Sequence, residues 1–289
     1  MKSVLILGGT QFVGKRLVQL LIDDGVEVTI ATRGLTADAF GNQVSRLIIN
    51  REDSESLNTA FKDKEWDVVF DQTCYSSQEA LDTLNALTGK VQKYIFTSSQ
   101  AVYDFGINHK EEGFNPLEFT PVLKTRREYI GYVGYQEAKR AAEAILFQKA
   151  AIPVTAVRFP IILGQDDYTN RLKFHVEHVK DGKAMFSENP DLRYSFIDSG
   201  EAASFLYCIA QSDFHGSINP GSQGDCSLGE LISLIEELVS VKANLREDGE
   251  LSPYNLPGSW SVNTDLAQSL GYKFTTLDKL LRDLIIYYS

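Results

Sequence analysis

The first half of the chain alternates short apolar runs with amphipathic segments, and this alternation constrains the fold more than any other feature. The segment after the first run places Val13, Leu17 and Leu21 on one helical face, and Gly25 ends it. Strands separated by helices at this spacing predict an α/β fold with a parallel sheet covered on both faces. The predicted strands are residues 3–7, 26–31, 46–49, 67–71, 91–97 and 154–158.

A glycine-rich turn, Gly8-Gly9-Thr10-Gln11-Phe12-Val13-Gly14, connects the first predicted strand to the first predicted helix. In this context the glycines favour a Rossmann-type, doubly wound sheet, with a dinucleotide pyrophosphate at the helix N-terminus. We therefore expect Gly8, Thr10, Gln11, Phe12 and Gly14 to contact the cofactor. Gln11 stands where the usual fingerprint has its middle glycine, so a purely structural strand–helix turn is the alternative.

The alternation weakens beyond Gly164 and divides the chain into two predicted parts. We expect a Rossmann domain over residues 1–163, to which residues 194–210 return, and a smaller α/β substrate subdomain over 164–289. The segment of residues 105–133 is too long for a routine connection between elements. Its length predicts a lid, a binding loop or a disordered segment. Capping boxes are expected to open two helices, Ser76 with Glu79 and Ser227 with Glu230.

The composition excludes several classes of protein. A hydrophobic content of 43% is typical of a globular chain, and no apolar run approaches the ~20 residues that span a bilayer. Three scattered cysteines predict neither a disulfide framework nor a metal site, and with no signal sequence at the N-terminus they favour a cytoplasmic protein. The net charge of −11 disfavours binding of nucleic acid, because it repels phosphates at long range. Binding would need a local basic patch, and the densest basic run, residues 124–127, is short.

The end of the second predicted strand indicates which dinucleotide is bound. NAD enzymes usually place an acid there, whereas an arginine accommodates the 2′-phosphate of NADP. This chain has Arg33 and no acid, which favours NADP over NAD; an exposed loop arginine is the alternative. Cys74, at the end of the fourth strand, lies where the cofactor is expected to pass, and a packed thiol is the other interpretation.

Tyr135 and Lys139 form the candidate proton-handling pair. Four residues apart, they share one face of the helix that follows the fifth strand. An ammonium group and an oxidised nicotinamide both favour a phenolate, which brings a tyrosine into the range of a useful base. Lysine can also hydrogen-bond the nicotinamide ribose. Ser98 or Ser99, at the carboxyl end of the fifth strand, can hydrogen-bond the oxygen of a substrate, or can serve only the turn.

Together these residues resemble an extended short-chain dehydrogenase/reductase of the NAD-dependent epimerase/dehydratase family. The resemblance covers almost the whole chain. It implies that Ser99 positions the substrate, that Tyr135 is the acid/base and that Lys139 activates it. It further implies that Pro160 borders the cofactor and that Arg193 contacts a nucleotide-sugar diphosphate. The matching segments are the GGTxFxG turn, SSxxVY at 98–103, Tyr135 to Glu143, Arg158-Phe159-Pro160, Arg193 with 196–198, and residues 265–272.

Departures from the family pattern narrow the function. Gln11 and Arg33 are more similar to a side branch that includes the chloroplast stem-loop-binding proteins, which keeps an RNA-associated role open. Gln100 and Ala101 stand where 4,6-dehydratases of the family carry an Asp-Glu pair, so dehydration is not expected. An epimerase and a reductase both remain.

We therefore expect an NAD(P)-dependent oxidoreductase or epimerase that acts on a secondary alcohol or ketone of a sugar or nucleotide-sugar. Arg171 is a further candidate for a substrate anion, and we expect His175 and His178 to lie on a packed or solvated face rather than to bind a metal. The alternative is a regulatory or RNA-associated protein that binds a dinucleotide with little catalysis. The expected partner is a small molecule, and a homodimer is left open.

Overall fold

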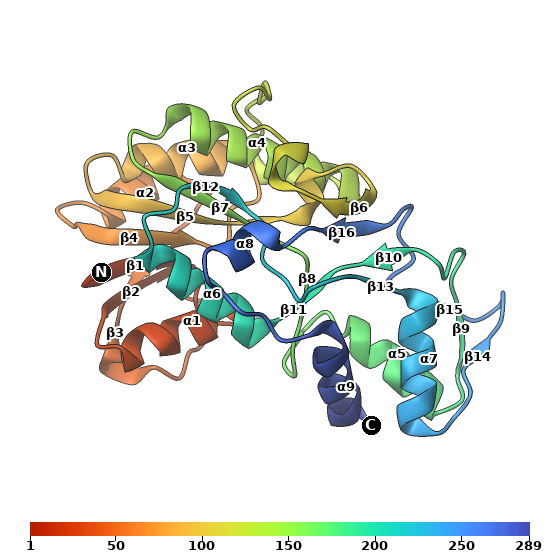
Figure 1. Cartoon of the computed structure of the whole chain (residues 1–289). Helices are drawn as coiled ribbons and strands as arrows, with labels where there is room; N and C mark the ends of the chain where they lie inside the picture. The colour runs from red at the N-terminus through yellow and green to blue at the C-terminus, as the bar shows by residue number, and fades with distance from the viewer. The chain divides into compact units, whose positions relative to one another are not determined.

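The computed structural model describes all 289 residues, and these form two compact units (Figure 1). The first unit comprises Met1–Tyr103, Glu111–Phe159 and Ala202–Ile218. The second comprises Asp104–Lys110, Pro160–Glu201 and Asn219–Ser289.

The first unit is built on a seven-stranded sheet whose order is β12-β7-β5-β4-β1-β2-β3. Every neighbouring pair is parallel, as the alternation of strands and helices predicts. The carboxyl ends of these strands therefore meet at one edge, which is where ligands bind in open parallel sheets. The strands are β1 (Ser3–Leu7), β2 (Glu27–Thr32), β3 (Val44–Ile48), β4 (Trp66–Asp71), β5 (Val91–Ser99), β7 (Val154–Phe159) and β12 (Gly216–Ile218).

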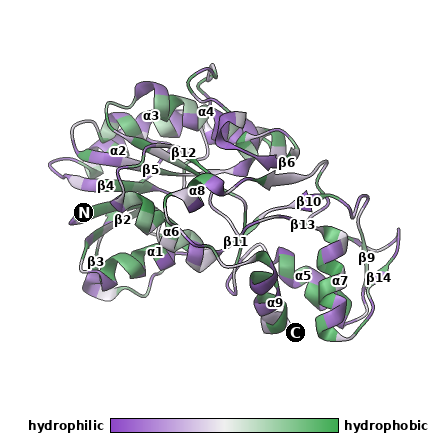
Figure 2. Ribbon diagram, viewed as in Figure 1, coloured by the Kyte–Doolittle hydropathy of each residue, from purple (hydrophilic) through white to green (hydrophobic).

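Helices cover both faces of this sheet (Figure 1). On one face lie α2 (Ser54–Ala60), α3 (Ser77–Ala86) and α4 (Gly131–Lys149), and on the other lie α1 (Phe12–Asp23) and α6 (Ser199–Gln211). Figure 2 shows that the helices carry hydrophobic and hydrophilic residues together, as expected for helices with one buried face. The core between α2, α3, α4 and the sheet includes Leu5, Phe61, Tyr94 and Phe96, all fully buried.

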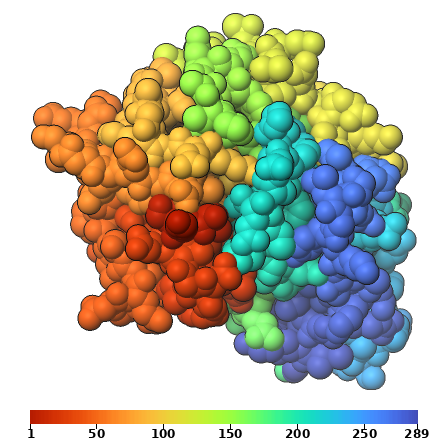
Figure 3. All heavy atoms as spheres, turned by 60° about the vertical axis from the view of Figure 1, so that its left-hand side comes forward, coloured from red at the N-terminus to blue at the C-terminus, as the bar shows by residue number.

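The segment that returns to the first unit is Ala202–Ile218, further along the chain than the expected 194–210. The reason is strand pairing, because β12 extends the main sheet beside β7. Figure 3 shows this segment, in teal and cyan, at the surface beside the red N-terminal residues. The unit boundary falls between Phe159 and Pro160, rather than after residue 163.

The second unit contains three small sheets and a group of packed helices. The sheets have the orders β13-β10-β16-β6, β11-β8 and β14-β9-β15, and the helices α5, α7 and α9 pack on one another. The strands are β6 (Gly106–His109), β8 (Ile161–Leu163), β9 (Ala184–Phe186), β10 (Arg193–Tyr194), β11 (Phe196–Asp198), β13 (Cys226–Ser227), β14 (Asn244–Leu245), β15 (Glu250–Leu251) and β16 (Trp260–Val262). The helices are α5 (Arg171–Lys180), α7 (Leu228–Val239), α8 (Asp265–Ser269) and α9 (Leu277–Tyr288). None of the helices in either unit has the length and apolar character needed to cross a bilayer.

The two predicted capping boxes have different outcomes. At the start of α7, Ser227 and Glu230 exchange both hydrogen bonds, which confirms the prediction. At the start of α3, Ser76 accepts the N–H of Glu79, but the Glu79 carboxylate accepts the N–H of Tyr75 instead of that of Ser76. The predicted hydrogen bond from the N–H of Ser76 to Glu79 is therefore wrong, because the Glu79 carboxylate binds the loop before the helix instead.

The long segment before α4 contributes to both units and is held by side chains of the first. Besides β6 it contains only short 3-10 turns, at Glu111–Gly113 and Arg126–Glu128. The Gln148 amide of α4 donates to the carbonyls of Pro116 and Phe119, each at 2.8 Å. Residues 111–119 are thereby fastened along α4.

Candidate active site

The glycine turn has the backbone geometry that the sequence predicts. Gly8 and Gly9 have φ values of +110° and +96°, which residues other than glycine rarely adopt. A Cβ on Gly14 would lie 2.9 Å from the Cα of Gly9, so the start of α1 and the turn approach each other too closely for any side chain. Thr10, Gln11 and Phe12 complete the turn, with Phe12 also at positive φ.

The N-terminus of α1 is open to an anion. Gln11, the N-cap residue, makes no capping hydrogen bond through its side chain, and the first turn contains no acidic residue. Beside it, the buried amide nitrogen of Gln72 has no hydrogen-bond partner, while the amide oxygen lies 2.9 Å from the position of a Cβ on Gly14. Free N–H groups and an unpaired donor at one turn fit a pyrophosphate. Sequence reasoning missed Gln72, although its place directly after β4 was a usable signal.

Arg33 is exposed directly after β2 and makes no hydrogen bond or ion pair. The chain turns immediately after it, where the N–H of Gly34 donates to the Thr32 hydroxyl at 3.1 Å and Gly34 has a φ of +71°. The guanidinium is therefore free to meet a phosphate. This leaves NADP preference as a prediction.

Lys139 is the best-defined group of the candidate site. Its side chain is 2% exposed, and its ammonium donates to the carbonyls of Cys74, at 3.0 Å, and Thr97, at 2.9 Å. These carbonyls lie where β4 and β5 reach the ligand-binding edge of the sheet. Lys139 makes no salt bridge, so it brings a buried positive charge to this edge that no carboxylate neutralises.

Tyr135 lies one helical turn before Lys139 on α4 and is 38% exposed. The Lys139 ammonium is 5.8 Å from the centroid of its ring. Ser99 ends β5, and its hydroxyl accepts the N–H of Ala101 at 3.2 Å, which leaves the hydroxyl proton for another partner. The first unit thus holds a phenol, an ammonium and a hydroxyl on two neighbouring elements.

Other residues singled out in the sequence are structural. Ser98 donates to the fully buried Glu143 of α4, which pairs with the fully buried Arg158 of β7 at 2.7 Å. Arg158 also donates to the Tyr103 hydroxyl and to carbonyls of residues 111 and 114. Ser98 is therefore committed to this network, and Ser99 remains the serine candidate.

Cys74 is a packed thiol whose carbonyl, rather than its sulfur, faces the candidate site. The side chain is fully buried, and its S–H donates to the carbonyl of Ser76. Burial, aided by the nearby Asp71 carboxylate, raises the pKa of the Cys74 thiol to about 12. Neutral at physiological pH, the thiol has no reactive thiolate to offer.

Two further arginines hold the loop between β4 and α3. Sequence reasoning missed Arg51, and it placed Arg126 only in the basic run at 124–127. Arg51 pairs with the fully buried Asp71 at the end of β4 and donates to the Thr73 hydroxyl. Arg126 pairs with Glu79 at 2.6 Å and donates to the carbonyl of Thr73 at 2.8 Å. The loop that presents the Cys74 carbonyl to Lys139 is therefore held from two sides.

The basic run at 124–127, which was the densest candidate patch for nucleic acid, is neutralised. Lys124 pairs with Glu137 at 2.6 Å, and Arg127 reaches Glu52 at 3.5 Å. Arg126 pairs with Glu79, as described above. Each cation has an acidic partner outside the run, so the run contributes little net positive charge.

The remaining predicted ligand residues, Pro160, Arg171 and Arg193, belong to the second unit. Arg193 is held by Asp225, at 2.6 Å, and Glu230, at 2.9 Å, at the edge of a cavity of about 610 Å³. To grip a diphosphate, its guanidinium would have to exchange these carboxylates for phosphate oxygens. The Arg171 carbonyl accepts from the His175 ring, whose other nitrogen meets the Ser252 hydroxyl, so His175 is a packed residue.

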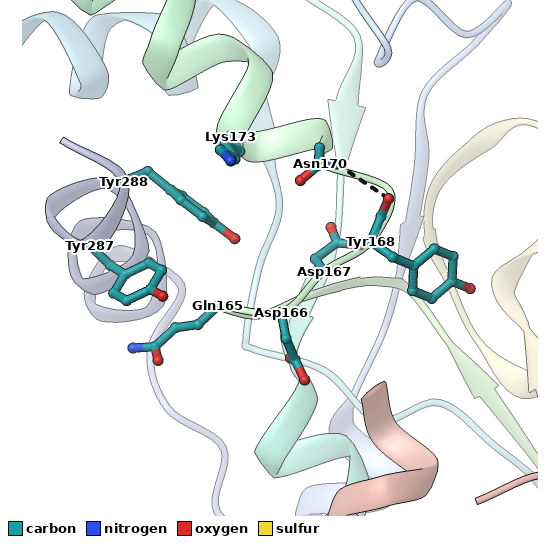
Figure 4. A pocket seen from close by; sticks show the side chains of 8 residues that line it. All are labelled: Gln165, Asp166, Asp167, Tyr168, Asn170, Lys173, Tyr287 and Tyr288. Carbon is teal, nitrogen blue, oxygen red and sulfur yellow. Dashed lines mark hydrogen bonds between the residues drawn. The ribbon is translucent and has the colours of Figure 1, made fainter. Parts of the chain in front are cut away.

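A second cavity in this unit, of about 560 Å³, lies between the loop before α5 and the end of α9 (Figure 4). Figure 4 shows the Tyr287 and Tyr288 rings on one side, while the ring of Tyr168 points away from them. The Tyr288 hydroxyl donates to the carbonyl of Gly164 at 2.7 Å. Carboxylates, amides and phenols together suit a ligand with several hydroxyl groups. The lining residues are Gln165, Asp166, Asp167, Tyr168, Asn170, Lys173, Tyr287 and Tyr288.

Comparisons with known proteins identify the family of this chain. The model of the NAD dependent epimerase/dehydratase family matches residues 4–219. The chloroplast stem-loop binding protein of 41 kDa b from Arabidopsis thaliana is 26% identical over 210 residues, which are 67% of this chain and 51% of that protein. The chain thus spans about half the length of this curated relative.

Solved structures of similar fold include sugar-nucleotide epimerases and a dTDP-glucose 4,6-dehydratase. UDP-glucose 4-epimerase from Thermus thermophilus, solved in complex with NAD, superposes with a TM-score of 0.75 at 17% identity, over 99% of this chain and 98% of that one. UDP-N-acetylglucosamine 4-epimerase from Methanobrevibacter ruminantium superposes with a TM-score of 0.74 at 19% identity, with the same coverage. At these identities the likeness establishes the fold.

Proposed function

Because the chain belongs to the NAD dependent epimerase/dehydratase family, we propose that it is an NAD(P)-dependent epimerase or reductase with Tyr135 as its acid/base. Its substrate is a secondary alcohol or ketone of a sugar or nucleotide-sugar. The observation that carries the proposal is the buried Lys139 ammonium, bonded to two carbonyls and to no carboxylate, one helical turn from the exposed Tyr135 phenol. A protein that only binds a dinucleotide has no need of such a pair.

The residues that would hold the cofactor are those of the glycine turn, with Gln72 and Arg33. The turn offers backbone N–H groups, Gln72 offers a free amide donor, and Arg33 offers an unpaired guanidinium after β2. When bound, the dinucleotide supplies or accepts a hydride at the carbinol carbon. Solved structures of similar fold include complexes with NAD, which supports this cofactor class.

Tyr135 moves the proton of the reacting oxygen. In oxidation, its phenolate accepts the proton of the substrate hydroxyl; in reduction, its phenol returns a proton to the carbonyl oxygen. Lys139 favours the phenolate through its charge, and the carbonyls of Cys74 and Thr97 keep that charge in place. The Ser99 hydroxyl donates a hydrogen bond to the same substrate oxygen and so orients it.

The sugar class of the substrate is supported by the solved structures of similar fold, which include UDP-sugar 4-epimerases. Dehydration is not proposed, because Gln100 and Ala101 offer no acid beside Ser99.

The test is a turnover screen. The protein is loaded with NAD or NADP and mixed with UDP- and dTDP-hexoses, and the absorbance of reduced nicotinamide and the configuration of the product sugar are followed. We expect either oxidation and reduction of a sugar or a change in its configuration. Failure to bind either dinucleotide would contradict the proposal, and binding without turnover of any sugar would redirect it to a smaller carbonyl substrate.

A second candidate function is a dinucleotide-binding regulatory or RNA-associated protein, favoured by the stem-loop binding relative. The net charge of −11 and the paired basic run oppose it. Filter binding of a structured RNA over a range of salt concentrations separates the two. Tight, salt-dependent RNA binding without turnover would favour this second function.

A further inference from the structure

The side chain of Tyr75, directly after Cys74, has no role in the proton transfer proposed above, yet it contacts the groups that perform it. The centroid of its ring lies 4.8 Å from the Lys139 ammonium and 4.9 Å from the guanidinium carbon of Arg126. The Tyr135 ring is next to it, with the two centroids 6.4 Å apart and the planes inclined by 39°. The Tyr75 ring thus lies against both members of the Tyr135–Lys139 pair.

The Lys139 ammonium is enclosed by two rings and two carbonyls. Tyr75 and Phe96 each lie 4.8 Å from the nitrogen, and the carbonyls of Cys74 and Thr97 accept its hydrogen bonds. A desolvated cation over an aromatic face is stabilised electrostatically by the ring, and more strongly than at an exposed site. The enclosure therefore keeps the charge beside Tyr135 instead of letting the flexible lysine stem carry it to water.

Tyr75 is itself held in place by an ion pair whose carboxylate is buried. Its backbone N–H donates to the Glu79 carboxylate at 2.9 Å, and Glu79, 2% exposed, pairs with Arg126. Arg126 also donates to the carbonyl of Thr73, two residues before Tyr75. Arg126 thereby holds the backbone directly at Thr73 and, through its two hydrogen bonds to the Glu79 carboxylate, at the N–H of Tyr75.

We propose that Tyr75 is a positioning residue, whose ring fixes the Lys139 ammonium beside Tyr135 while Arg126 and Glu79 fix the ring. The proposal rests on the proposed function, because it assigns Tyr75 a part in preparing the acid/base. The contact with the ammonium is made by the aromatic ring and not by the hydroxyl. Tyr75→Phe should therefore keep the ammonium in place, whereas Tyr75→Leu should leave it free to move.

The experiment measures the ionisation of Tyr135 without substrate. Tyrosine labelled with carbon-13 at Cζ reports each phenol by NMR, and the Tyr135 resonance is assigned from its loss in Tyr135→Phe. The titration midpoint of Tyr135 is then compared in wild type, Tyr75→Phe and Tyr75→Leu. Tyr132→Leu is the matched control, since Tyr132 also lies exposed in the first turn of α4.

We expect wild type, Tyr75→Phe and Tyr132→Leu to titrate together. Tyr75→Leu should raise the Tyr135 midpoint by about one pH unit, because a displaced ammonium stabilises the phenolate less and an opposite charge within ~4–6 Å is worth at least about one unit. An unchanged midpoint in Tyr75→Leu, or an equal shift in Tyr75→Phe, would overturn the proposal. If Tyr75→Leu does not fold, Arg126→Gln loosens the ring from outside and should shift the midpoint in the same direction; no shift there would also overturn it.

This result is independent of turnover. A shifted midpoint combined with an active Tyr135→Phe protein would refute the proposed function while leaving the contact between Tyr75 and Lys139 intact. The unchanged midpoint, by contrast, refutes only the positioning role.

Discussion

Replacing Glu143 by glutamine should destabilise the protein substantially, because it leaves a fully buried arginine without its carboxylate. Glu143 and Arg158 are both fully buried, and the carboxylate is the only anion that the guanidinium contacts. The other acceptors of Arg158 are neutral: the Tyr103 hydroxyl and the carbonyls of residues 111 and 114. Glutamine keeps the shape of the side chain and one acceptor, but it leaves the positive charge uncompensated.

The magnitude follows from that geometry. Removing one partner of a buried ion pair costs about 3–5 kcal/mol, because the remaining charge stays buried. The neutral acceptors keep Arg158 hydrogen-bonded, so we expect the lower part of that range, about 3 kcal/mol. The cost should appear first around residues 111–119, since Arg158 holds this segment through two carbonyls.

Urea denaturation of wild type and Glu143→Gln measures the difference, with hydrogen exchange to locate it. The control is Glu237→Gln, which breaks an exposed pair with Arg282 at a similar distance of 2.9 Å. Exposed pairs contribute little, so the control should denature at nearly the wild-type midpoint. A Glu143→Gln protein as stable as the control would refute the argument that this charge is uncompensated.

Three further predictions follow from single side chains. Burial lowers the pKa of His175 to about 4, so the folded state resists protonation of this ring. The free energy of unfolding should therefore be highest above pH ~6.5 and fall by about 3 kcal/mol as the pH is lowered to ~4. Urea midpoints across this range should lose part of that slope in His175→Gln, and an identical slope would contradict the assignment. Arg33 should make NADP bind about tenfold more tightly than NAD, and Arg33→Ala should abolish the preference in a calorimetric titration; equal wild-type affinities would refute it. Arg193→Ala should weaken nucleotide-sugar binding with little effect on the dinucleotide, whereas tighter binding on loss of Arg193 would show that its pairing with Asp225 and Glu230 is purely structural.

Local sequence patterns predicted the elements that present the site. The apolar runs and the glycine turn identify β1, α1 and the parallel sheet, because strand and helix periodicities are local properties. The Tyr135–Lys139 spacing likewise identifies the helix face of α4. Pairing of β12 with β7 could not be predicted, because it depends on contacts between segments far apart in the chain.

The partners of charged residues were also beyond the sequence. Lys139 bonds two backbone carbonyls, which no residue type reveals, and the basic run at 124–127 meets acids on other elements. The motif residues Glu143 and Arg158 carried a family signal without showing that they pair with each other. Sequence thus indicates which residues carry chemistry, while the fold decides which of them remain free to perform it.

Turnover by Tyr135→Phe tests the proposed mechanism most directly. The substitution keeps the ring and removes the proton that the phenol exchanges, and Tyr132→Phe is the matched control on the same helix turn. General acid–base catalysis contributes about 10²–10⁴ in rate, so Tyr135→Phe should lose at least that factor while Tyr132→Phe stays near wild type, with fold and dinucleotide affinity retained in both. A folded Tyr135→Phe protein that turns over substrate at the wild-type rate would contradict the assignment of Tyr135 as the acid/base.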